Sequence, residues 1–274
     1  MGYTDKFGNP LKEDGIAGSK TLYAFDKFDE NTGSNNKNQS NQPYMKENVP
    51  LYSDELFKNA TLLNTSDNGN LSKGDEKRNK VKQTMIKCLS SNWYANKGNS
   101  ENQEKIHNQA EKLRKFDDNN FCKAYLLNSS TSAGIPPITA GHSAVMLMNT
   151  SGEALVFSFY PTNEKLFQNI YTDGEIRFSV LTDNQAQKAL NGEYIYSMSA
   201  SDGEIKTERY DRYKEYNIES GYNIYNHAVS LYDNPGKYNL LLRQCDDVAV
   251  EILRKVGIDI ESKLWPNRTY EKTK

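Results

Sequence analysis

Thiols and imidazoles are the scarcest reactive groups in this 274-residue chain. The sequence contains three residues of each type, namely Cys88, Cys122 and Cys245, and His107, His142 and His227. An odd number of cysteines, with no pair in a C-x-x-C arrangement, predicts neither a disulfide framework nor a metal knuckle. The remaining chemical role for one of these cysteines is that of a catalytic nucleophile, which attacks a carbonyl carbon while an imidazole takes the thiol proton.

Cys245 lies at the start of the clearest helical pattern in the chain, about Gln244–Val256. Its apolar residues fall at helical spacing, and Gly257 is placed to end the helix. Unpaired N–H groups and the helix dipole favour an anion at such a start, which predicts a lowered thiol pKa and donors for an oxyanion. Asp246 and Asp247 oppose this effect, so we expect a nearby imidazolium to assist.

A hairpin is predicted for the run His142–Pro161. Its two apolar stretches flank the turn residues Asn149-Thr150-Ser151-Gly152. If Asn149 pairs with Glu153 across a three-residue turn, the register of the whole hairpin follows.

That register determines which side chains accompany His142. It places Tyr160 opposite His142 and Ser158 two residues away, and strand alternation puts all three on one face. We therefore expect Ser158 or Tyr160 to orient His142, the role of the third partner in a catalytic triad. A shift by one residue would present Phe157 and Phe159 instead.

The other thiols and imidazoles have structural interpretations. Cys88 and Cys122 have no histidine motif near them and are interpreted as packing residues. His107 lies in the polar stretch EKIHNQAEK, where a solvated helix face is expected. His227 is the rival general base for Cys245, although no predicted hairpin holds it.

Composition divides the chain into three regions. Residues 1–72 form an irregular polar N-terminal segment. Residues 73–121 are predicted to be helical, with helices at Lys73–Cys88 and Ser100–Phe116 joined by a loop. Residues 122–274, which are richer in β-branched and aromatic residues, are the predicted catalytic domain.

Further elements are expected within the third region. A strand at Ile176–Leu181 precedes a helix that starts at Thr182, where Gln185 completes a capping box and Gly192 ends the run. A short helix is expected before Asn234-Pro235-Gly236. The intervening tyrosine-rich tract has no clear assignment.

Charge and hydropathy exclude several function classes. The chain is 36% hydrophobic and 26% charged, with a net charge of −2 and a mean hydropathy of −0.83. Such a balance gives no bulk attraction to nucleic acid or anionic membranes. No apolar run approaches a membrane span, and Met1 opens a polar segment rather than a signal peptide. We expect synthesis in the cytoplasm without a signal peptide, and no metal or organic cofactor.

Three motifs in this order resemble a known family. GHSAVML, then SFYP, then YNLLLRQCDDVAVEILRKVGI are similar to the pattern of circularly permuted papain-like (NlpC-type) hydrolase domains, over about residues 133–266. Gln244 stands where that family usually has Asn, Asp247-Val248 replaces Asp-Phe, and Ser158 replaces Gly. The resemblance implies an α+β papain-like fold in permuted order, with a His-bearing antiparallel sheet before the Cys-bearing helix. It also implies Cys245 as nucleophile and His142 as base.

The resemblance further implies a biological setting. Such domains occur in bacterial secreted effectors and toxins, so the expected function is a cysteine hydrolase that cleaves a protein or peptidoglycan, delivered into a target cell by a machine such as type VI secretion. An immunity protein and a secretion adaptor are the implied partners. Acyl transfer or deamidation by the same Cys-His pair, and a catalytically silent binding module, remain as alternatives.

Overall fold

The computed structural model describes residues 73–131, 134–135, 138–139, 141–162, 171–199, 204–219, 221–239, 242–262 and 266–272. All of them fall within one compact unit. The predicted polar segment 1–72 lies outside the described residues. The division of the chain at residues 73 and 122 stays a prediction.

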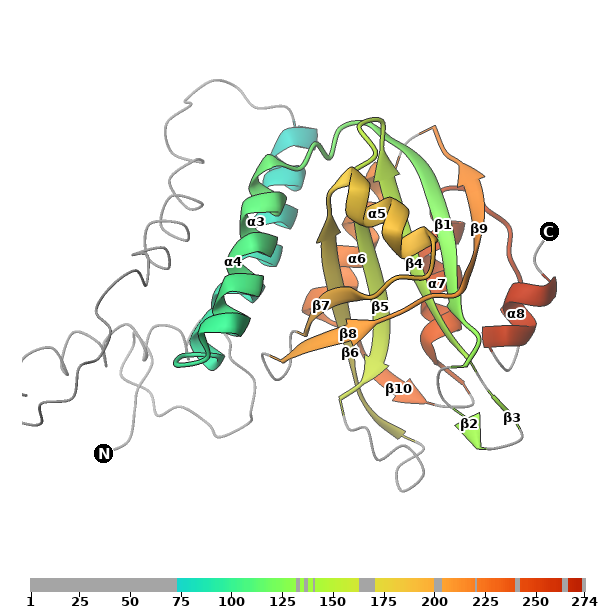
Figure 1. Ribbon diagram of the computed structural model, residues 1–274. Coiled ribbons are helices and arrows are strands. Elements are labelled where there is room, and N and C mark those ends of the chain that lie inside the picture. The colour runs from blue at the N-terminus through green and yellow to red at the C-terminus, as the bar shows by residue number, and fades with distance from the viewer. Residues whose placement is uncertain are drawn as a thin grey trace, which may run out of the picture. The chain divides into compact units, whose positions relative to one another are not determined.

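The described residues form an α+β fold, as the sequence predicts (Figure 1). The helices are α3 (Lys73–Ala95), α4 (Ser100–Lys115), α5 (Asp183–Leu190), α6 (Tyr222–Asp233), α7 (Cys245–Arg254) and α8 (Pro266–Lys272). The strands are β1 (Phe121–Ser129), β2 (Gly134–Ile135), β3 (Ile138–Thr139), β4 (His142–Asn149), β5 (Ala154–Pro161), β6 (Tyr171–Leu181), β7 (Ile195–Ser199), β8 (Ile205–Glu208), β9 (Arg212–Asn217) and β10 (Lys237–Asn239).

One antiparallel sheet organises the fold. Its strands lie in the order β8-β7-β6-β5-β4-β1-β9, and β10 pairs with the outer part of β6. The short strands β2 and β3 form a separate hairpin. The His-bearing strand β4 is central in the sheet and precedes the Cys-bearing helix α7 in the chain.

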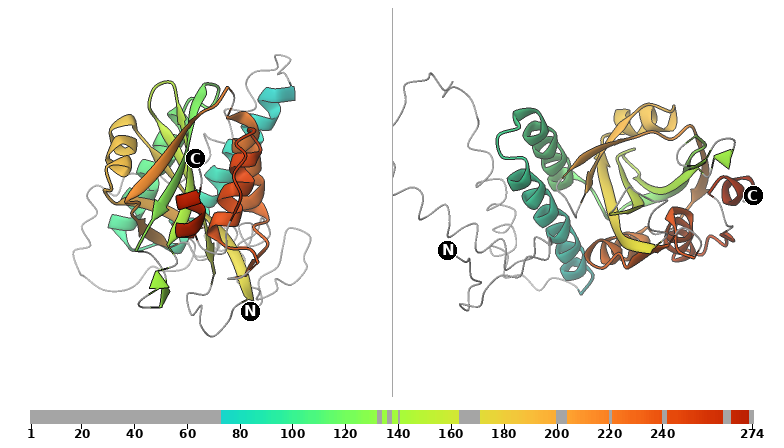
Figure 2. Two further views of the ribbon diagram at one scale, coloured as in Figure 1. Left: turned by 90° about the vertical axis from the view of Figure 1, so that its right-hand side faces the viewer. Right: turned by 90° about the horizontal axis from the view of Figure 1, so that it is seen from below.

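Two hydrophobic cores lie on the two faces of this sheet. Helices α3, α4, α6 and α7 cover one face, on which Val145, Leu147, Leu155 and Phe157 point towards them. Helix α5 lies on the other face, where Ala186 and Ala189 pack against residues such as Met146 and Val156. Figure 2 shows the helices on either side of the curved sheet. Alternate residues of β4 and β5 therefore enter different cores.

The predicted hairpin and its register are confirmed. The backbone N–H of Asn149 donates to the carbonyl of Glu153 at 2.9 Å, and Ala144 pairs with Ser158. Gly152 has φ of +81°, a left-handed conformation that a side chain would disfavour. The turn thus spans three residues, and the hairpin has no one-residue shift.

Both predicted ends of α5 and the predicted start of α7 are also confirmed. Thr182 and Gln185 form the capping box of α5, and Gly192 follows the helix with φ of +81°. Helix α7 begins at Cys245, with Gln244 as its N-cap, but it ends at Arg254 with Lys255 as its C-cap, shortly before the predicted end at Val256. Gly257 follows with φ of +81°.

Two predicted boundaries were wrong. Helix α3 continues to Ala95 because Leu89 and Trp93 are buried in the core, so most of the predicted interhelical loop is helical. Strand β6 begins at Tyr171 rather than Ile176, because its first residues pair with β10, a strand that the sequence did not predict. Both errors came from tertiary contacts that local periodicity does not reveal.

Candidate functional site

Cys245 is the first residue of α7, and its side chain is buried. The residue is 3% exposed, and the Ser143 backbone on β4 hydrogen-bonds to its sulfur. Burial, and secondly the charge of Asp246, raise the pKa of this thiol to about 12, while the Ser143 hydrogen bond opposes the rise. The lowered thiol pKa predicted from the helix start is therefore wrong for this structure, because desolvation outweighs the helix terminus.

His142 begins β4 and is also buried. Burial, and secondly the positive charge of Arg177, lower the pKa of the imidazole to about 3. Its Nε2 lies 3.4 Å from Ser158 Oγ. Its ring stacks on Tyr160, with ring centroids 4.2 Å apart and an interplanar angle of 26°. The Tyr210 ring also stacks beside it, with centroids 6.3 Å apart. The imidazole is thus held by one polar contact and two aromatic contacts, and it is neutral at pH 7.

The structure brings three of the four predicted site residues together. His142, Ser158 and Tyr160 share one face of the sheet, as the register predicts. Ser158 contacts the imidazole through its hydroxyl, whereas Tyr160 contacts it through the face of its ring.

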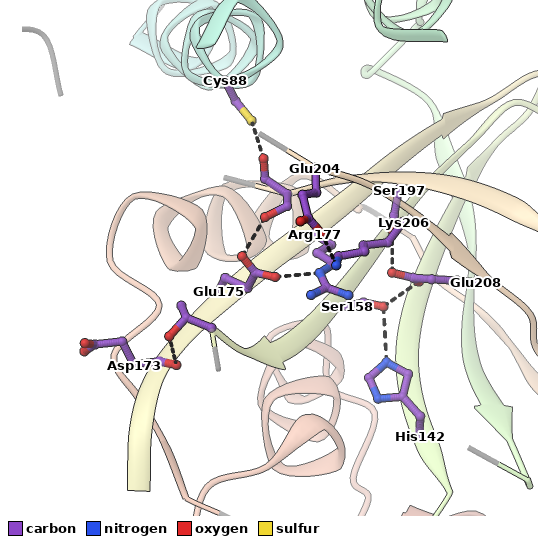
Figure 3. A network of polar contacts seen from close by, with 12 residues as sticks. Cys88, His142, Ser158, Asp173, Glu175, Arg177, Ser197, Glu204, Lys206 and Glu208 are labelled. Carbon is purple, nitrogen blue, oxygen red and sulfur yellow. Dashed lines mark hydrogen bonds and ion pairs between the residues drawn. The ribbon is translucent and has the colours of Figure 1, made fainter. Parts of the chain in front are cut away.

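Sequence reasoning missed the carboxylate behind Ser158, which belongs to Glu208 at the end of β8. Ser158 Oγ donates to Glu208 Oε2 at 2.9 Å, and Ser197 Oγ donates to Oε1 at 2.5 Å (Figure 3). The Tyr210 hydroxyl also donates to Oε2. Glu208 is 5% exposed, so these hydroxyl groups compensate its lost hydration. No signal in the sequence ties β8 to the hairpin.

Arg177 completes the surroundings of Tyr160. Its guanidinium lies 4.0 Å from the centroid of the Tyr160 ring, which is within cation–π range. Its Nε donates to Glu175 Oε1 at 2.6 Å, and Ser199 Oγ donates to Glu175 Oε2 at 2.6 Å. Both Glu175 and Arg177 are nearly fully buried, so the stack beside His142 is fixed by a paired charge.

A cavity of about 420 Å³ opens beside the imidazole. It is polar and aromatic in character and is lined by Ser129, Thr131, His142, Tyr160, Tyr194, Thr207, Glu208, Arg209, Tyr210 and Asp211. Cys245 is not among these residues. The cavity therefore gives a ligand access to the imidazole and its carboxylate, but not directly to the thiol.

The thiol and the imidazole both lie near the start of β4, and the charge of Cys245 also acts on Tyr160, which stacks on His142. Helix α7 packs in the core that contains Val145, whereas the ring of His142 contacts Ser158 on the other face. The thiol contacts the backbone of Ser143, the residue that follows His142 on β4. Among the described residues, the imidazole hydrogen-bonds to Ser158 and not to Cys245.

The rival base is engaged elsewhere. His227 Nε2 lies 2.9 Å from Glu251 Oε1, and Glu251 also binds Arg243 at 3.1 Å. Cys88 is buried between α3 and the sheet, and Cys122 is partly exposed. The described ranges contain no cluster of three or more potential metal-binding side chains. Nor does any helix within them combine the length and apolarity needed to cross a membrane.

Comparisons with known proteins add little to this geometry. The chain matches no protein-family model and no curated protein. A solved structure that matches it is that of TseH, a type VI secretion system effector. The TM-score is 0.31 at 12% identity, over 58% of this chain and 91% of that one.

Proposed function

We propose that the chain is a cysteine hydrolase in which Cys245 is the nucleophile and His142 the general base. The observation that supports this most is the contact of the Cys245 sulfur with the backbone of Ser143, next to His142, at the start of a helix. The motif order that resembles permuted papain-like domains supports the same pair. Ser158 and Tyr160 would orient the imidazole.

The reaction would be acyl transfer to water. His142 takes the Sγ proton of Cys245 as sulfur bonds to an amide carbonyl carbon, and N–H groups at the start of α7 stabilise the oxyanion. The C–N bond then breaks, and the imidazolium gives its proton to the leaving amine. Water, deprotonated by His142, attacks the thioester carbon, which releases the acid and returns the proton to sulfur.

The resting site is not yet charged for this reaction. A thiol with a pKa of about 12 and an imidazole with a pKa of about 3 are both neutral at pH 7. Substrate binding would therefore have to bring the imidazole of His142 and the thiol of Cys245 together. The thiol would then transfer its proton to the imidazole as the sulfur attacks the carbonyl carbon. Burial explains why the thiol and the imidazole are both neutral, because each charged form would lose its hydration.

Toxicity on expression tests this proposal with single substitutions. Wild type and Cys245→Ala are expressed separately in the bacterial cytoplasm and periplasm, with Cys122→Ala as the matched cysteine control. We expect Cys245→Ala and His142→Gln to abolish toxicity and Cys122→Ala to retain it. Toxicity confined to the periplasm would indicate peptidoglycan as substrate, and toxicity in the cytoplasm would indicate a protein. Full toxicity of Cys245→Ala would contradict the proposal.

We also propose that the chain acts as an effector toxin, which the same expression experiment tests. The polar N-terminal region and the resemblance to effector domains support delivery into a target cell, with an immunity protein and a secretion adaptor as partners. Rescue by co-expression of a neighbouring gene product would identify the immunity protein. If the Cys-His pair performs acyl transfer or deamidation instead, mass spectrometry of the substrate would show a mass change without backbone cleavage.

A second candidate function is a binding module without catalysis. It is favoured by the cavity, which reaches His142 and Glu208 but not Cys245. In that case Cys245→Ala would leave the biological effect intact, whereas a residue that lines the cavity, such as Tyr210, would be required.

A further inference from the structure

We propose that Glu208 is a positioning residue that acts through Ser158 to fix the tautomer of His142, with hydrogen on Nε2 and the lone pair on Nδ1. This inference rests on the proposed function for its catalytic meaning, but its geometry does not depend on it. It deepens the proposed function by naming a third partner on a strand that the sequence did not connect with the site.

The assignment follows from counting hydrogens around Ser158. Its hydroxyl has one hydrogen and lies close to Glu208 Oε2 at 2.9 Å, Tyr210 Oη at 2.8 Å and His142 Nε2 at 3.4 Å, and it also hydrogen-bonds to the Tyr160 side chain. A carboxylate can only accept, so the contact with Glu208 takes the Ser158 hydrogen, and the Tyr210 hydrogen is shared between Glu208 Oε2 and Ser158 Oγ. Towards His142, Ser158 then offers only a lone pair, and Nε2 must carry a hydrogen to complete the bond.

Glu208 is held rigidly enough to impose this direction. Ser197 Oγ donates to its other oxygen at 2.5 Å, and the Tyr210 hydroxyl donates to Oε2. All three neighbours that bond to the carboxylate are donors, so none competes for the role of acceptor. Ser158, Ser197 and Glu208 are all at most 5% exposed, so the carboxylate depends on these hydroxyl donors for most of its hydrogen bonding.

The consequence concerns which nitrogen can act as a base. With Nε2 carrying its hydrogen and donating to Ser158, Nδ1 holds the lone pair that can accept a proton. The opposite tautomer would leave Nε2 as the base and direct it at a buried hydroxyl. The arrangement Glu208–Ser158–His142 thus serves as a triad with a serine inserted between the acid and the imidazole.

The side chain of His142 can be observed directly. With only three histidines in the chain, long-range ¹H–¹⁵N spectra of protein labelled at histidine resolve each ring, and His107→Gln and His227→Gln assign the signals. At pH 7.5 we expect wild-type His142 to be the Nε2–H tautomer. In Glu208→Gln, the new amide can donate to Ser158 and turn its hydrogen towards His142. The ratio should shift towards Nδ1–H by roughly five- to tenfold, the worth of one buried hydrogen bond.

Two further variants separate this effect from general damage. Ser158→Ala leaves the carboxylate bonded to Ser197 and Tyr210, yet it should shift the tautomer in the same direction. Asp118→Asn changes a buried carboxylate between α4 and β1, near the turn end of β4, where Asn149 donates to the Asp117 carbonyl, so it should leave the tautomer unchanged. Thermal unfolding of each variant establishes that the fold is retained.

The outcomes distinguish this inference from the proposed function. An Nδ1–H tautomer in wild type, an unchanged tautomer in both Glu208→Gln and Ser158→Ala, or an equal shift in Asp118→Asn would overturn the role of Glu208. These measurements need no substrate. A tautomer shift together with full toxicity of Cys245→Ala would instead reject the hydrolase and retain the Glu208 network. If the hydrolase is correct, Glu208→Gln should also change the pH profile of its activity, as loss of packing alone would not.

Discussion

Replacing Asp246 by asparagine removes the charge that acts most strongly on the candidate nucleophile. Asp246 is 0% exposed, and its Oδ2 accepts from Thr269 at 2.6 Å and from Ser262 at 3.1 Å. Burial raises its pKa to about 6, so at pH 8 it is ionised and raises the pKa of the Cys245 thiol. Asparagine has nearly the same shape and can still accept from Thr269, so the substitution mainly deletes the charge.

The size of the effect follows from Coulomb's law. At an effective dielectric constant of about 20, two unit charges roughly 5 to 8 Å apart interact by about 2 to 3 kcal/mol, which corresponds to about 1.5 to 2.5 pKa units. The thiolate fraction at pH 8 rises by the same power of ten. Nucleophilicity falls with pKa at a Brønsted slope of about 0.5, so the net alkylation rate should increase roughly 5- to 20-fold.

Alkylation by iodoacetamide at pH 8, followed at each cysteine by mass spectrometry, measures this rate. The partly exposed Cys122 serves as internal reference within the same sample. Asp247→Asn is the matched control, because the charge of Asp247 has a smaller effect on the pKa of Cys245. No acceleration at Cys245 in Asp246→Asn, or a larger one in Asp247→Asn with equal thermal stability, would refute the electrostatic reasoning.

Three stability measurements test other parts of the structure. The pKa of His142 is about 3 in the folded protein, below its ordinary value, so below pH 6.5 the unfolded chain binds a proton that the folded chain does not, and the free energy of unfolding falls with the pH. In His142→Gln, the loss of unfolding free energy between pH 7.5 and 4.5 should be smaller than in wild type by roughly 2 to 3 kcal/mol. Urea titrations at the two pH values measure this difference. Asp246 has a raised pKa in the folded protein, so its ionisation destabilises the fold as the pH rises from about 4 to 6. The free energy of unfolding of Asp246→Asn should therefore increase relative to that of wild type by about 2 to 3 kcal/mol between pH 4 and 8. The same stability difference between the two proteins at both pH values would contradict this. In Gly141→Ala, at φ of +79°, the new Cβ would lie 2.2 Å from Asn267 Oδ1. In the control Gly257→Ala, at φ of +81°, the new Cβ would meet nothing within 4 Å. Thermal unfolding should therefore show a loss of stability that is about 1 to 3 kcal/mol larger for Gly141→Ala than for Gly257→Ala.

Local patterns predicted the parts of the site that depend on local geometry. The turn at Asn149–Gly152 and strand alternation were sufficient to place His142, Ser158 and Tyr160 together, because register in a hairpin follows from its turn. The start of α7 at Cys245 followed from helical periodicity in the same way.

The rest of the site depends on contacts between elements far apart in sequence. Glu208 and Tyr210 follow a tract with no clear pattern, and they reach Ser158 because β7 and β8 continue the sheet beyond β6. The raised thiol pKa of Cys245 had the same origin. A helix start lowers a thiol pKa only if the sulfur remains hydrated or meets a cation, and neither condition can be read from the helix alone.

Helix α8 links the strands that carry His142 to the helix that carries Cys245. Asn267 Nδ2 donates to the carbonyl of Ser130, at the end of the strand that pairs with His142. Two residues later, Thr269 Oγ1 donates to Asp246 Oδ2 beside Cys245. One short helix therefore bonds both to the sheet that carries the imidazole and to the helix that carries the thiol. Because these bonds cross the strand end where the two groups approach each other, a change in α8 would alter their separation without touching either.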